Sequence, residues 1–367
     1  MIEFEAAVLS AVGRPLSIER VRIGALGPDD VLVRIKASGL CHTDLEVMQG
    51  SLAYPMPIIL GHEGAGIVEA VGGAVVDVKV GDSVVCSWNP HCGHCFYCER
   101  DLPILCEVYT AHQPKGHLFD GQSRLAGAKG KIHHFSVVSS HAQYAVVPQS
   151  GAIVVPPEIP HDRACLIGCG VMTGVGAAAR LARIEPGSSV AVIGCGAVGL
   201  NAIQGAIIAG AGQVIAIDRA QARLDLARQF GATQTLMGDP AAILDGVKAV
   251  SQGRGADYVL EAAGSEIGFR IGAEITRPGG QLVFLGKVAF GQDVSFRWGS
   301  LMGEKKIVRS AYGGARPKRD FPWLARLYLD GKLKLDELIT ARLPLARIND
   351  GFDAMRRGDG IRTVVLP

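Results

Sequence analysis

Gly194-Cys-Gly-Ala-Val-Gly199 is the stretch that decides the fold of this chain. It matches the pattern GxGxxG, continues the apolar run that begins at Ser189, and opens a helical pattern. In that context the first glycine permits a tight turn, the second lets backbone approach a pyrophosphate, and the third lets the helix pack on the strand. The pattern alone is weak, because a chain with 48 glycines produces it by chance. A glycine-rich turn that binds nothing is the alternative interpretation.

An acidic residue ends the next predicted strand. Asp218 follows Gly199 by nineteen positions, where a carboxylate accepts hydrogen bonds from the adenosine ribose of a dinucleotide and repels a 2′-phosphate. The sequence therefore favours NAD over NADP. Arg219 argues mildly the other way, since an arginine there can bind a phosphate, and Asp218 as a simple helix-starting acid stays open.

Strands and helices alternate around this motif. Short apolar strands are predicted at 189–194, 214–218, 258–262 and 281–286, with helical segments such as 220–230 between them. Such alternation predicts a doubly wound parallel sheet. The chain before about residue 155 is instead β-rich, and the part after about Gly313 has mixed character and ends in a β-like segment. We therefore expect two regions of different architecture.

Length and composition exclude several classes. A chain of 367 residues suggests two domains. Its net charge of +2 gives no electrostatic argument for a nucleic-acid partner. The first five residues lack the order of a secretory signal, and the weakly charged stretch 190–217 contains six glycines and divides into strand, helix and strand. We expect no membrane span and a cytoplasmic location.

Four of the nine cysteines lie within fifteen residues: Cys92, Cys95, Cys98 and Cys106. Without an export signal, such a cluster indicates metal binding rather than disulfides. Two-residue gaps let successive thiolates bind one tetrahedral zinc ion at about 2.3 Å. Four sulfurs close the coordination sphere, which predicts a structural zinc and leaves no vacancy for His91 or His94. A redox pair or unpaired thiols is the alternative.

A second candidate set is dispersed along the chain and consists of Cys41, His62 and Cys169. Two cysteines and one histidine leave one zinc position open, which is the form of a catalytic site. Spacing alone makes this grouping a guess, because a single cysteine or histidine is more often a packed core residue.

Five motifs in order resemble those of the medium-chain zinc alcohol dehydrogenases. They are Cys41-His-Thr-Asp, Gly61-His-Glu-Gly-Ala-Gly, the four-cysteine lobe, Ile167-Gly-Cys-Gly and the Gly194 fingerprint. The likeness covers essentially the whole chain, including Ile132-His-His-Phe and the segment from Asp350. It is similar to the dimeric liver-type and glutathione-dependent classes and to bacterial aryl-alcohol relatives.

The resemblance implies an α/β fold with two domains. A GroES-like, β-rich catalytic domain would occupy 1–170, with the structural-zinc lobe at 86–110. An NAD-binding Rossmann domain with a doubly wound parallel sheet would occupy 171–312, and 313–367 would return to the catalytic domain. A homodimer joined through the cofactor domains is also implied, with the β-like segment 282–294 as the contact.

The resemblance also assigns residues to the active site. Cys41, His62 and Cys169 would bind a catalytic zinc, with Glu63 as an alternative ligand. Asp44 would orient the zinc-bound histidine, and Thr43 would hydrogen-bond the substrate oxygen. The implied NAD contacts are His42, Thr173, Gly194, Gly196, Val198, Gly199, Asp218, Arg223, Leu285, Lys287 and Arg362. The implied pocket residues are Tyr54, Trp88, Phe135 and Met302, each of which could equally be ordinary core. Lys287 stands where the liver type usually has a small apolar residue.

The implied function is a zinc-dependent oxidoreductase that interconverts primary alcohols and aldehydes with NAD. The open zinc position would favour alcohol deprotonation, and hydride would pass to the nicotinamide. The proton would leave through Thr43 and the nicotinamide ribose. Glu46 stands where a histidine often ends this relay; Glu46 as base, water as base, and a solvated surface glutamate all stay open. Large apolar pocket residues favour aromatic, allylic or medium-chain alcohols.

Two alternatives are kept. A glutathione-dependent formaldehyde dehydrogenase would need an arginine where Thr110 stands and acids within 51–57, where the sequence has none. A zinc-stabilised binding protein without catalysis would have no need for an open zinc site beside a dinucleotide fold.

Overall fold

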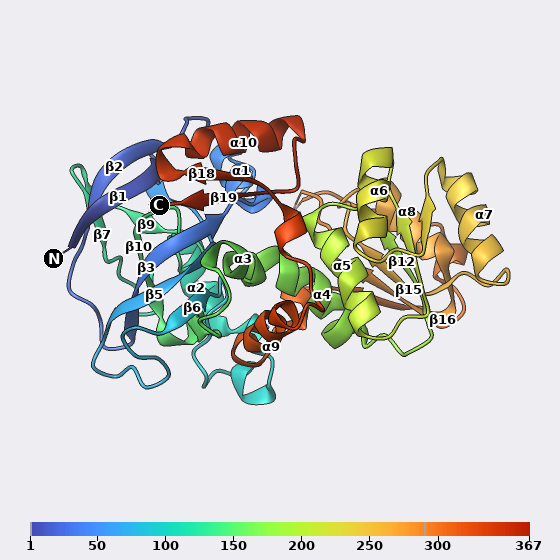
Figure 1. Ribbon diagram of the computed structural model, residues 1–367, viewed down its shortest axis with the longest axis horizontal. Helices are drawn as coiled ribbons and strands as arrows, with labels where there is room; N and C mark the ends of the chain where they lie inside the picture. Colours follow the sequence, from blue (N-terminus) through green and yellow to red (C-terminus); the bar gives the residue numbers. More distant parts are fainter. Residues whose placement is uncertain (1, 290) are drawn as a thin grey trace. The chain divides into compact units, whose positions relative to one another are not determined.

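The computed structural model describes residues 2–289 and 291–367. The chain forms two compact units, of which the first contains the residues up to Cys169 together with Arg316–Pro367 and the second contains Gly170–Ala315 (Figure 1). The first unit is built mainly from β-sheets and the second from a sheet surrounded by helices.

One sheet of the first unit has the strand order β8-β7-β2-β1-β4-β9. Its long strands β1 and β2 pair antiparallel, and β4 pairs parallel with β9. The strands are β1 (Ile2–Leu9), β2 (Ser17–Ile23), β4 (Ile58–Ile59), β7 (Leu125–Gly127), β8 (Gly130–Lys131) and β9 (His133–His134).

The other sheet of the first unit brings the chain's beginning and end together. Its strands are β3 (Asp30–Gly39), β5 (Glu63–Val71), β6 (Ser83–Cys86), β10 (Tyr144–Pro148), β11 (Ala152–Val154), β18 (Ile339–Pro344) and β19 (Arg362–Leu366). The central strand β3 pairs antiparallel with β5, β10 and β19. Gly39, at the end of β3, is opposite Glu63 on one side and Val364 on the other. This register brings the residues that follow β3 close to the starts of β5 and β19.

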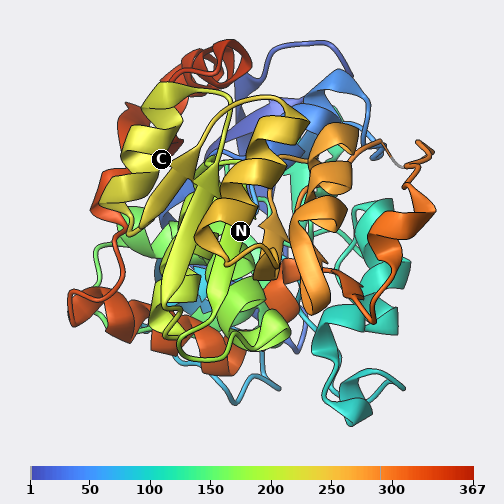
Figure 2. The same cartoon turned by 90° about the vertical axis from the view of Figure 1, so that its right-hand side faces the viewer.

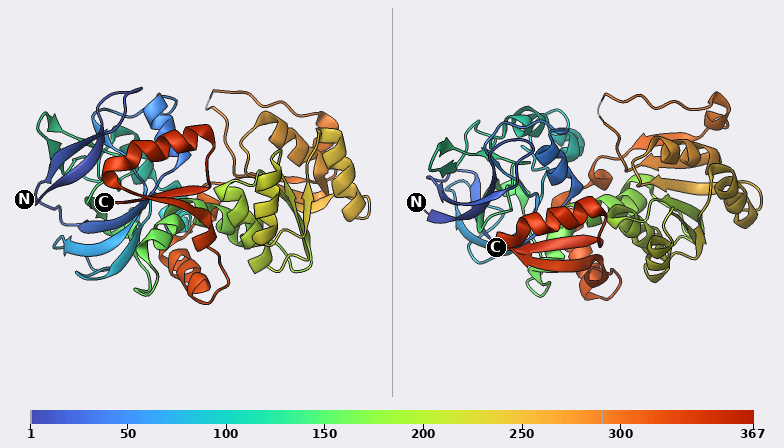
Figure 3. Two further views of the ribbon diagram at one scale, coloured as in Figure 1. Left: turned by 45° about the horizontal axis from the view of Figure 1, so that its top comes forward. Right: turned by 90° about the horizontal axis from the view of Figure 1, so that it is seen from above.

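Five helices belong to the first unit: α1 (His42–Gln49), α2 (Glu107–His112), α3 (His161–Leu166), α9 (Pro317–Leu329) and α10 (Ile348–Arg357). Figure 3 shows α10 and the two C-terminal strands, all in red, beside strands from the beginning of the chain. The apolar face of α10 explains this position, because Ile348 and Phe352 are fully buried in a core shared with Leu9, Leu40 and Val365.

The second unit contains a six-stranded parallel sheet with the order β14-β13-β12-β15-β16-β17. Its strands are β12 (Ser189–Ile193), β13 (Gln213–Ile217), β14 (Gln234–Leu236), β15 (Ala256–Glu261), β16 (Thr276–Phe284) and β17 (Lys306–Arg309). Its helices are α4 (Met172–Gly176), α5 (Ala197–Ile208), α6 (Gln221–Gln229), α7 (Pro240–Val250) and α8 (Glu266–Ile275), which surround the sheet in Figure 2. Along the chain, β13 and β14 are added on one side of β12, and β15, β16 and β17 are then added on its other side. This is the doubly wound arrangement. The predicted fold class is confirmed.

One segment differs from what the sequence suggested. Within 282–294, strand β16 ends at Phe284, and the described residues beyond it form no strand; residue 290 lies outside the described part of the chain. Gly286 and Gly291 weaken a strand there. The long polar stretch 108–140 contains α2 and β7–β9, since its few apolar residues, such as Leu118 and Ile132, are buried in the core.

Two weakly charged stretches of the chain are relevant to whether any helix could cross a membrane. The stretch His161–Ala182 is long and apolar enough to cross a membrane, but 72% of its most apolar window is buried inside the structure. A core helix passes the same test, so this feature is weak support for a span. Residues 190–217 form β12, α5 and β13, the predicted strand, helix and strand.

Candidate functional site

Four potential metal ligands from distant parts of the chain converge in the first unit. The ligand atoms of Cys41, His62, Glu63 and Cys169 all lie within 4.8 Å of one another. Cys41 follows β3 and precedes α1, His62 and Glu63 stand at the start of β5, and Cys169 lies in a π-helical turn after α3. The pairing of Gly39 with Glu63 explains the convergence. We call these four residues the active-site cluster.

The donor set of the active-site cluster fits a zinc ion. Thiolate, imidazole and carboxylate groups are the ligands that zinc takes in proteins. The pKa of the Cys41 thiol lies well below its ordinary value, because Cys169 hydrogen-bonds to it and His62 lies nearby. The same interaction with Cys41, together with burial, raises the pKa of Cys169. The cluster therefore favours an anionic sulfur, the form that binds a metal.

Glu63 forms a buried ion pair with Arg362, the first residue of β19. A side chain at position 39 would collide with the Glu63 carboxylate, so Gly39 is needed for this packing. Burial raises the pKa of Glu63 to about 7, against the lowering effect of Arg362. Glu63 Oε1 has no hydrogen-bond partner among the described residues, which leaves one carboxylate oxygen available inside the cluster.

Asp44 is a buried carboxylate behind the active-site cluster. It accepts hydrogen bonds from the backbone N–H of Gly61 at 3.0 Å and of Cys41 at 3.1 Å, and from His62 Nδ1 at 3.3 Å. Although burial opposes the charge, His62 and His141 hold the pKa of Asp44 well below its usual range. Because Nδ1 of His62 is directed to Asp44, Nε2 is the ring atom left for a metal.

Helix α1 carries the other residues predicted for the reaction. Thr43 Oγ1 lies 3.8 Å from Cys41 Sγ, Glu46 is half-buried one turn later, and His42 is exposed at the start of the helix. Thr43 is therefore the α1 hydroxyl at the cluster.

One of the four predicted pocket residues, Phe135, lies against the active-site cluster, and a second, Tyr54, packs on Phe135. The Phe135 ring packs edge-on against His62 at 5.5 Å between centroids, and Tyr54 packs on Phe135 at 5.0 Å. Trp88 instead lies beside Tyr109, with ring centroids 6.4 Å apart. Met302 belongs to the second unit and is 57% exposed.

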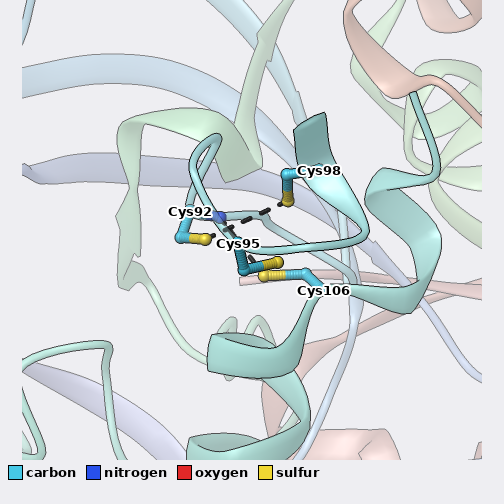
Figure 4. A group of neighbouring side chains, drawn as sticks. All are labelled: Cys92, Cys95, Cys98 and Cys106. Atoms are coloured by element: carbon cyan, nitrogen blue, oxygen red, sulfur yellow. Dashed lines mark hydrogen bonds between the residues drawn. The ribbon is translucent and has the colours of Figure 1, made fainter. Parts of the chain in front are cut away.

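The four-cysteine lobe forms a second cluster in the first unit (Figure 4). The sulfurs of Cys92, Cys95, Cys98 and Cys106 lie within 4.8 Å of one another, and those of Cys92 and Cys98 are 4.0 Å apart. Sulfurs at about 2.3 Å from one tetrahedral ion are about 3.8 Å apart, so the lobe fits a zinc ion. His94 Nδ1 is directed to the Cys92 carbonyl at 2.9 Å, and His94 is not among the four residues that gather at this site.

The glycines of the fingerprint in the second unit meet specific steric demands. Gly194 has φ +88°, and a Cβ at position 199 would stand 1.7 Å from the Gly194 carbonyl oxygen. A Cβ at position 196 would meet nothing within 4 Å, so the backbone there is open to a ligand. Helix α5 begins directly afterwards at Ala197. This arrangement fits a dinucleotide pyrophosphate at a helix N-terminus.

Asp218, at the end of β13, lies beside this loop. Its two carboxylate oxygens accept hydrogen bonds from the backbone N–H of Cys195 at 2.7 Å and of Ala220 at 3.0 Å. The remaining predicted cofactor residues of this unit are Thr173 in α4, Val198 in α5, Arg223 in α6, Leu285, buried just after β16, and Lys287, exposed two residues later.

Comparison with known proteins identifies the family. Residues 27–157 match the alcohol dehydrogenase GroES-like domain, and residues 197–330 match the zinc-binding dehydrogenase domain. The chain belongs to the zinc-dependent alcohol dehydrogenase family. It is an oxidoreductase by that membership, and the predicted resemblance is confirmed.

Relatives of this family match over nearly their full length. The class-3 alcohol dehydrogenase of Myxine glutinosa is 39% identical, covering 100% of this chain and 98% of that protein. The S-(hydroxymethyl)glutathione dehydrogenase of Aspergillus oryzae is 38% identical, covering 98% and 95%. The crystal structure of benzyl alcohol dehydrogenase from Acinetobacter calcoaceticus is 32% identical, with a TM-score of 0.94 and coverage of 100% and 99%. The names of these curated relatives refer to class-3 and glutathione-dependent dehydrogenases and not to aromatic-alcohol dehydrogenases.

The sequence interpretation missed the residues behind Asp44. His141 and Ser38 are fully buried there, and His141 Nδ1 lies 2.9 Å from Ser38 Oγ. Neither residue belongs to a motif with recognisable spacing, and a histidine after two serines carries no signal in a sequence. Only the packing of three segments brings them to Asp44.

Proposed function

We propose that this chain is a zinc-dependent dehydrogenase that transfers a hydride between a primary alcohol and NAD. The observation that carries the proposal is the convergence of Cys41, His62 and Cys169, with Glu63 beside them, in one cluster whose cysteines are half-buried and whose other two members are buried. Two sulfurs and one imidazole leave a zinc position for substrate, whereas the four-cysteine lobe is a closed, structural site. The zinc supplies a Lewis acid, and the nicotinamide accepts the hydride.

The residues around the cluster have separate roles in this proposal. Asp44 orients His62 and selects its Nε2 as ligand atom through the hydrogen bond to Nδ1. Arg362 balances the charge of Glu63, which stays within reach of the metal position. Phe135 and Tyr54 form an apolar wall beside His62 that excludes water from it.

Thr43 would relay the substrate proton in this proposal, because its hydroxyl is the one that α1 places next to Cys41. The hydroxyl would accept the proton of the alcohol while it donates its own proton to the nicotinamide ribose hydroxyl. Glu46 is the candidate for the next acceptor, since it lies one turn further along the same helix and is partly open to solvent. A slower proton release in Glu46→Gln, seen as a shifted pH profile of kcat, would assign it that role.

NAD is the proposed cofactor. Asp218 places a carboxylate beside the glycine loop, where it suits ribose hydroxyls and disfavours a 2′-phosphate. The open backbone at Gly196 supports a pyrophosphate contact there.

Two substrate classes are candidates. The names of the curated relatives support S-(hydroxymethyl)glutathione, and this is the better supported of the two. Apolar aromatic alcohols are favoured by the Phe135 and Tyr54 rings at His62 and by the similarity to benzyl alcohol dehydrogenase. Thr110 stands where a glutathione-dependent enzyme would need an arginine, and its hydroxyl donates to the Cys106 carbonyl. Thr110 therefore offers no positive charge to a glutathione adduct, which counts against that substrate class.

The deciding experiment measures NADH formation with two substrates: formaldehyde with and without glutathione, and benzyl alcohol. Strict dependence on glutathione supports the adduct, and efficient benzyl alcohol oxidation supports the aromatic class. Phe135→Leu is the matched variant: it should raise KM for benzyl alcohol and change KM for the glutathione adduct less, because it removes only ring contact. Turnover of neither substrate, in protein with two zinc ions per chain, would refute the proposed dehydrogenase.

The predicted domain limits, quaternary structure and location are part of the proposal. The division of the chain at Cys169/Gly170 and Ala315/Arg316 supports catalytic domains at 1–170 and 313–367 around a cofactor domain at 171–312. Exposed apolar side chains of the second unit, Ile267, Trp298 and Ile307, support a homodimer through the cofactor domains. A molar mass in solution that matches one chain or four would contradict the dimer. The cytoplasmic location rests on the sequence alone.

A further inference from the structure

The molecule contains one buried histidine beside the active-site cluster that the proposed reaction does not use. His141 has no exposed surface, and its Nε2 has no hydrogen-bond partner among the described residues. An unpaired polar atom in the interior is costly, because it has lost its water without gaining a partner. Its surroundings therefore require an explanation.

The backbone around His141 is tied to the segment that carries His62. The N–H of His141 donates to the Leu60 carbonyl at 3.0 Å, and the N–H of Ser140 donates to the Gly61 carbonyl at 2.9 Å. Gly61 has φ +92°, and a Cβ at that position would stand 2.5 Å from the His141 nitrogen and 2.6 Å from its Nδ1. Glycine at position 61 is thus what allows the His141 ring to lie against the segment that carries His62.

The His141 ring faces a polar chain on one side and Asp44 on the other. Ser140 Oγ lies 2.7 Å from Ser38 Oγ, and Ser38 Oγ lies 2.9 Å from His141 Nδ1. On the opposite side, His141 Nε2 lies 3.7 Å from Asp44 Oδ2. The edge of Phe352 closes a third side, with ring centroids 6.0 Å apart.

The tautomer of His141 follows from this arrangement. Asp44 is an acceptor, so the nitrogen that faces it is favoured as a donor, and Nδ1 then accepts from the Ser38 hydroxyl. Ser140 can in turn donate to Ser38, so that both hydroxyl hydrogens point along the chain of hydrogen bonds toward His141. The carboxylate of Asp44 thereby meets imidazole groups on both oxygens: His62 at Oδ1 and His141 at Oδ2.

We propose that His141 is a positioning residue for the catalytic metal, which holds the Asp44 carboxylate in the orientation that presents His62 to zinc. The inference rests on the proposed zinc site at Cys41, His62 and Cys169. Partners beyond the ligands of a metal site fix ring orientation and ligand basicity, and their loss typically weakens metal binding by about 10–100-fold. His141 acts one group further out, so we expect about a tenfold effect.

The test measures zinc release rather than turnover. Purified protein is mixed with an excess of chelator, and zinc release is followed with a zinc-responsive dye. His141→Phe keeps an aromatic ring against Phe352 but removes the donor, and it should release the active-site zinc about tenfold faster than wild type. The zinc of the four-cysteine lobe is the internal reference, and its release should not change.

Two variants separate positioning from packing. His141→Gln restores a donor toward Asp44 and should bring the release rate back toward that of wild type. His134→Phe is the matched control, since His134 is also fully buried in the first unit but lies outside the active-site cluster and the Asp44 group. It should leave the rate unchanged.

A structural role for His141 would give a different result. His141→Phe would then lower the unfolding temperature of zinc-loaded and zinc-free protein equally and leave zinc release unchanged, which would overturn the proposal. If His141→Phe does not fold, Ser38→Ala provides the test, because it frees Nδ1 without altering the ring; faster release of the active-site zinc supports the proposal, and an unchanged rate overturns it. Wild-type protein that binds a single zinc, in the lobe, would instead refute the proposed function.

Discussion

The two cysteine-containing clusters of this protein are held together in different ways. The four-cysteine lobe takes all its sulfurs from one loop of fifteen residues, and three of its four cysteines are partly exposed. The active-site cluster collects Cys41, His62, Glu63 and Cys169 from separate segments, with His62 and Glu63 fully buried. The lobe depends on local spacing, whereas the active-site cluster depends on strand register.

The difference has a physical consequence. In the lobe, the thiols interact with one another and with backbone N–H groups. Burial raises the pKa of the Cys95 thiol, but backbone donors at Cys98 and Glu107 outweigh this effect and lower the pKa to about 6. In the active-site cluster, buried charges surround the ligands, namely Asp44, Glu63 and Arg362. A closed local site stabilises structure, and a buried site with an open position and charged neighbours is suited to chemistry.

The largest expected effect separates the clusters directly. Cys41→Ala should lower kcat/KM by about a thousandfold or more, because Lewis-acid stabilisation is worth several kcal/mol. The fold and NAD binding should be largely retained, as measured by circular dichroism and NADH fluorescence. Cys165→Ala, at a buried cysteine outside both clusters, is the control and should stay active. Near-normal turnover in Cys41→Ala would contradict the assignment of the catalytic zinc.

Removal of a lobe cysteine should instead lower the stability of the protein more than its turnover. Cys106→Ala should reduce zinc from two ions per chain to one and lower the free energy of unfolding by several kcal/mol, since bound structural zinc contributes to folding. Turnover per folded chain should fall by less than about tenfold, because the open site remains. Metal analysis and thermal unfolding measure both effects, with Cys86→Ala as a buried cysteine control. Loss of activity without loss of stability would remove the distinction between the clusters.

Glu261 in the second unit can be compared with Glu63 in the first, because burial raises the pKa of both carboxyl groups to about 7. Glu261, at the end of β15, is fully buried and accepts hydrogen bonds from the backbone N–H of Ala263 and Gly264. Burial raises its pKa to about 7 from an ordinary 4.5. Between these values the folded chain holds a proton that the unfolded chain releases, so this contribution is present at low pH and is lost as pH rises toward 7.

The expected change is about 1–3 kcal/mol across that window. Glu261→Gln cannot titrate, so its unfolding midpoint should vary less between pH 5 and 8 than that of wild type. Denaturant titrations at each pH measure the difference. Identical pH profiles for the two proteins would show that Glu261 titrates normally.

The smallest expected effect concerns the cofactor loop. Asp218→Gly should reduce the preference for NAD over NADP by about tenfold, or about 1.4 kcal/mol, because it removes the carboxylate that opposes a 2′-phosphate. The ratio of kcat/KM for the two cofactors measures this change. Since Asp218 also binds the Cys195 N–H, Arg219→Ala is a useful control that leaves the carboxylate in place. An unchanged ratio in Asp218→Gly would assign the carboxylate to loop structure alone.

Local patterns in the sequence determined a large part of this molecule. The glycine fingerprint, the alternation of strands and helices, and the four-cysteine spacing are all short-range features, and each predicts structure because the residues involved are neighbours in the chain. The parallel sheet could be predicted for this reason.

The tertiary structure decided the arrangement of the active-site cluster. The sequence offered Cys41, His62 and Cys169 as a guess, and a family resemblance was needed to group them. Strand β3 pairs with both β5 and β19 and so brings Cys41, Glu63 and Arg362 together, although Glu63 and Arg362 are 299 positions apart in the chain. His141 is held near Asp44 by backbone hydrogen bonds from Ser140 and His141 to the residues just before His62. Such contacts depend on which strand lies beside which, and this choice depends on the packing of the whole unit rather than on any local pattern.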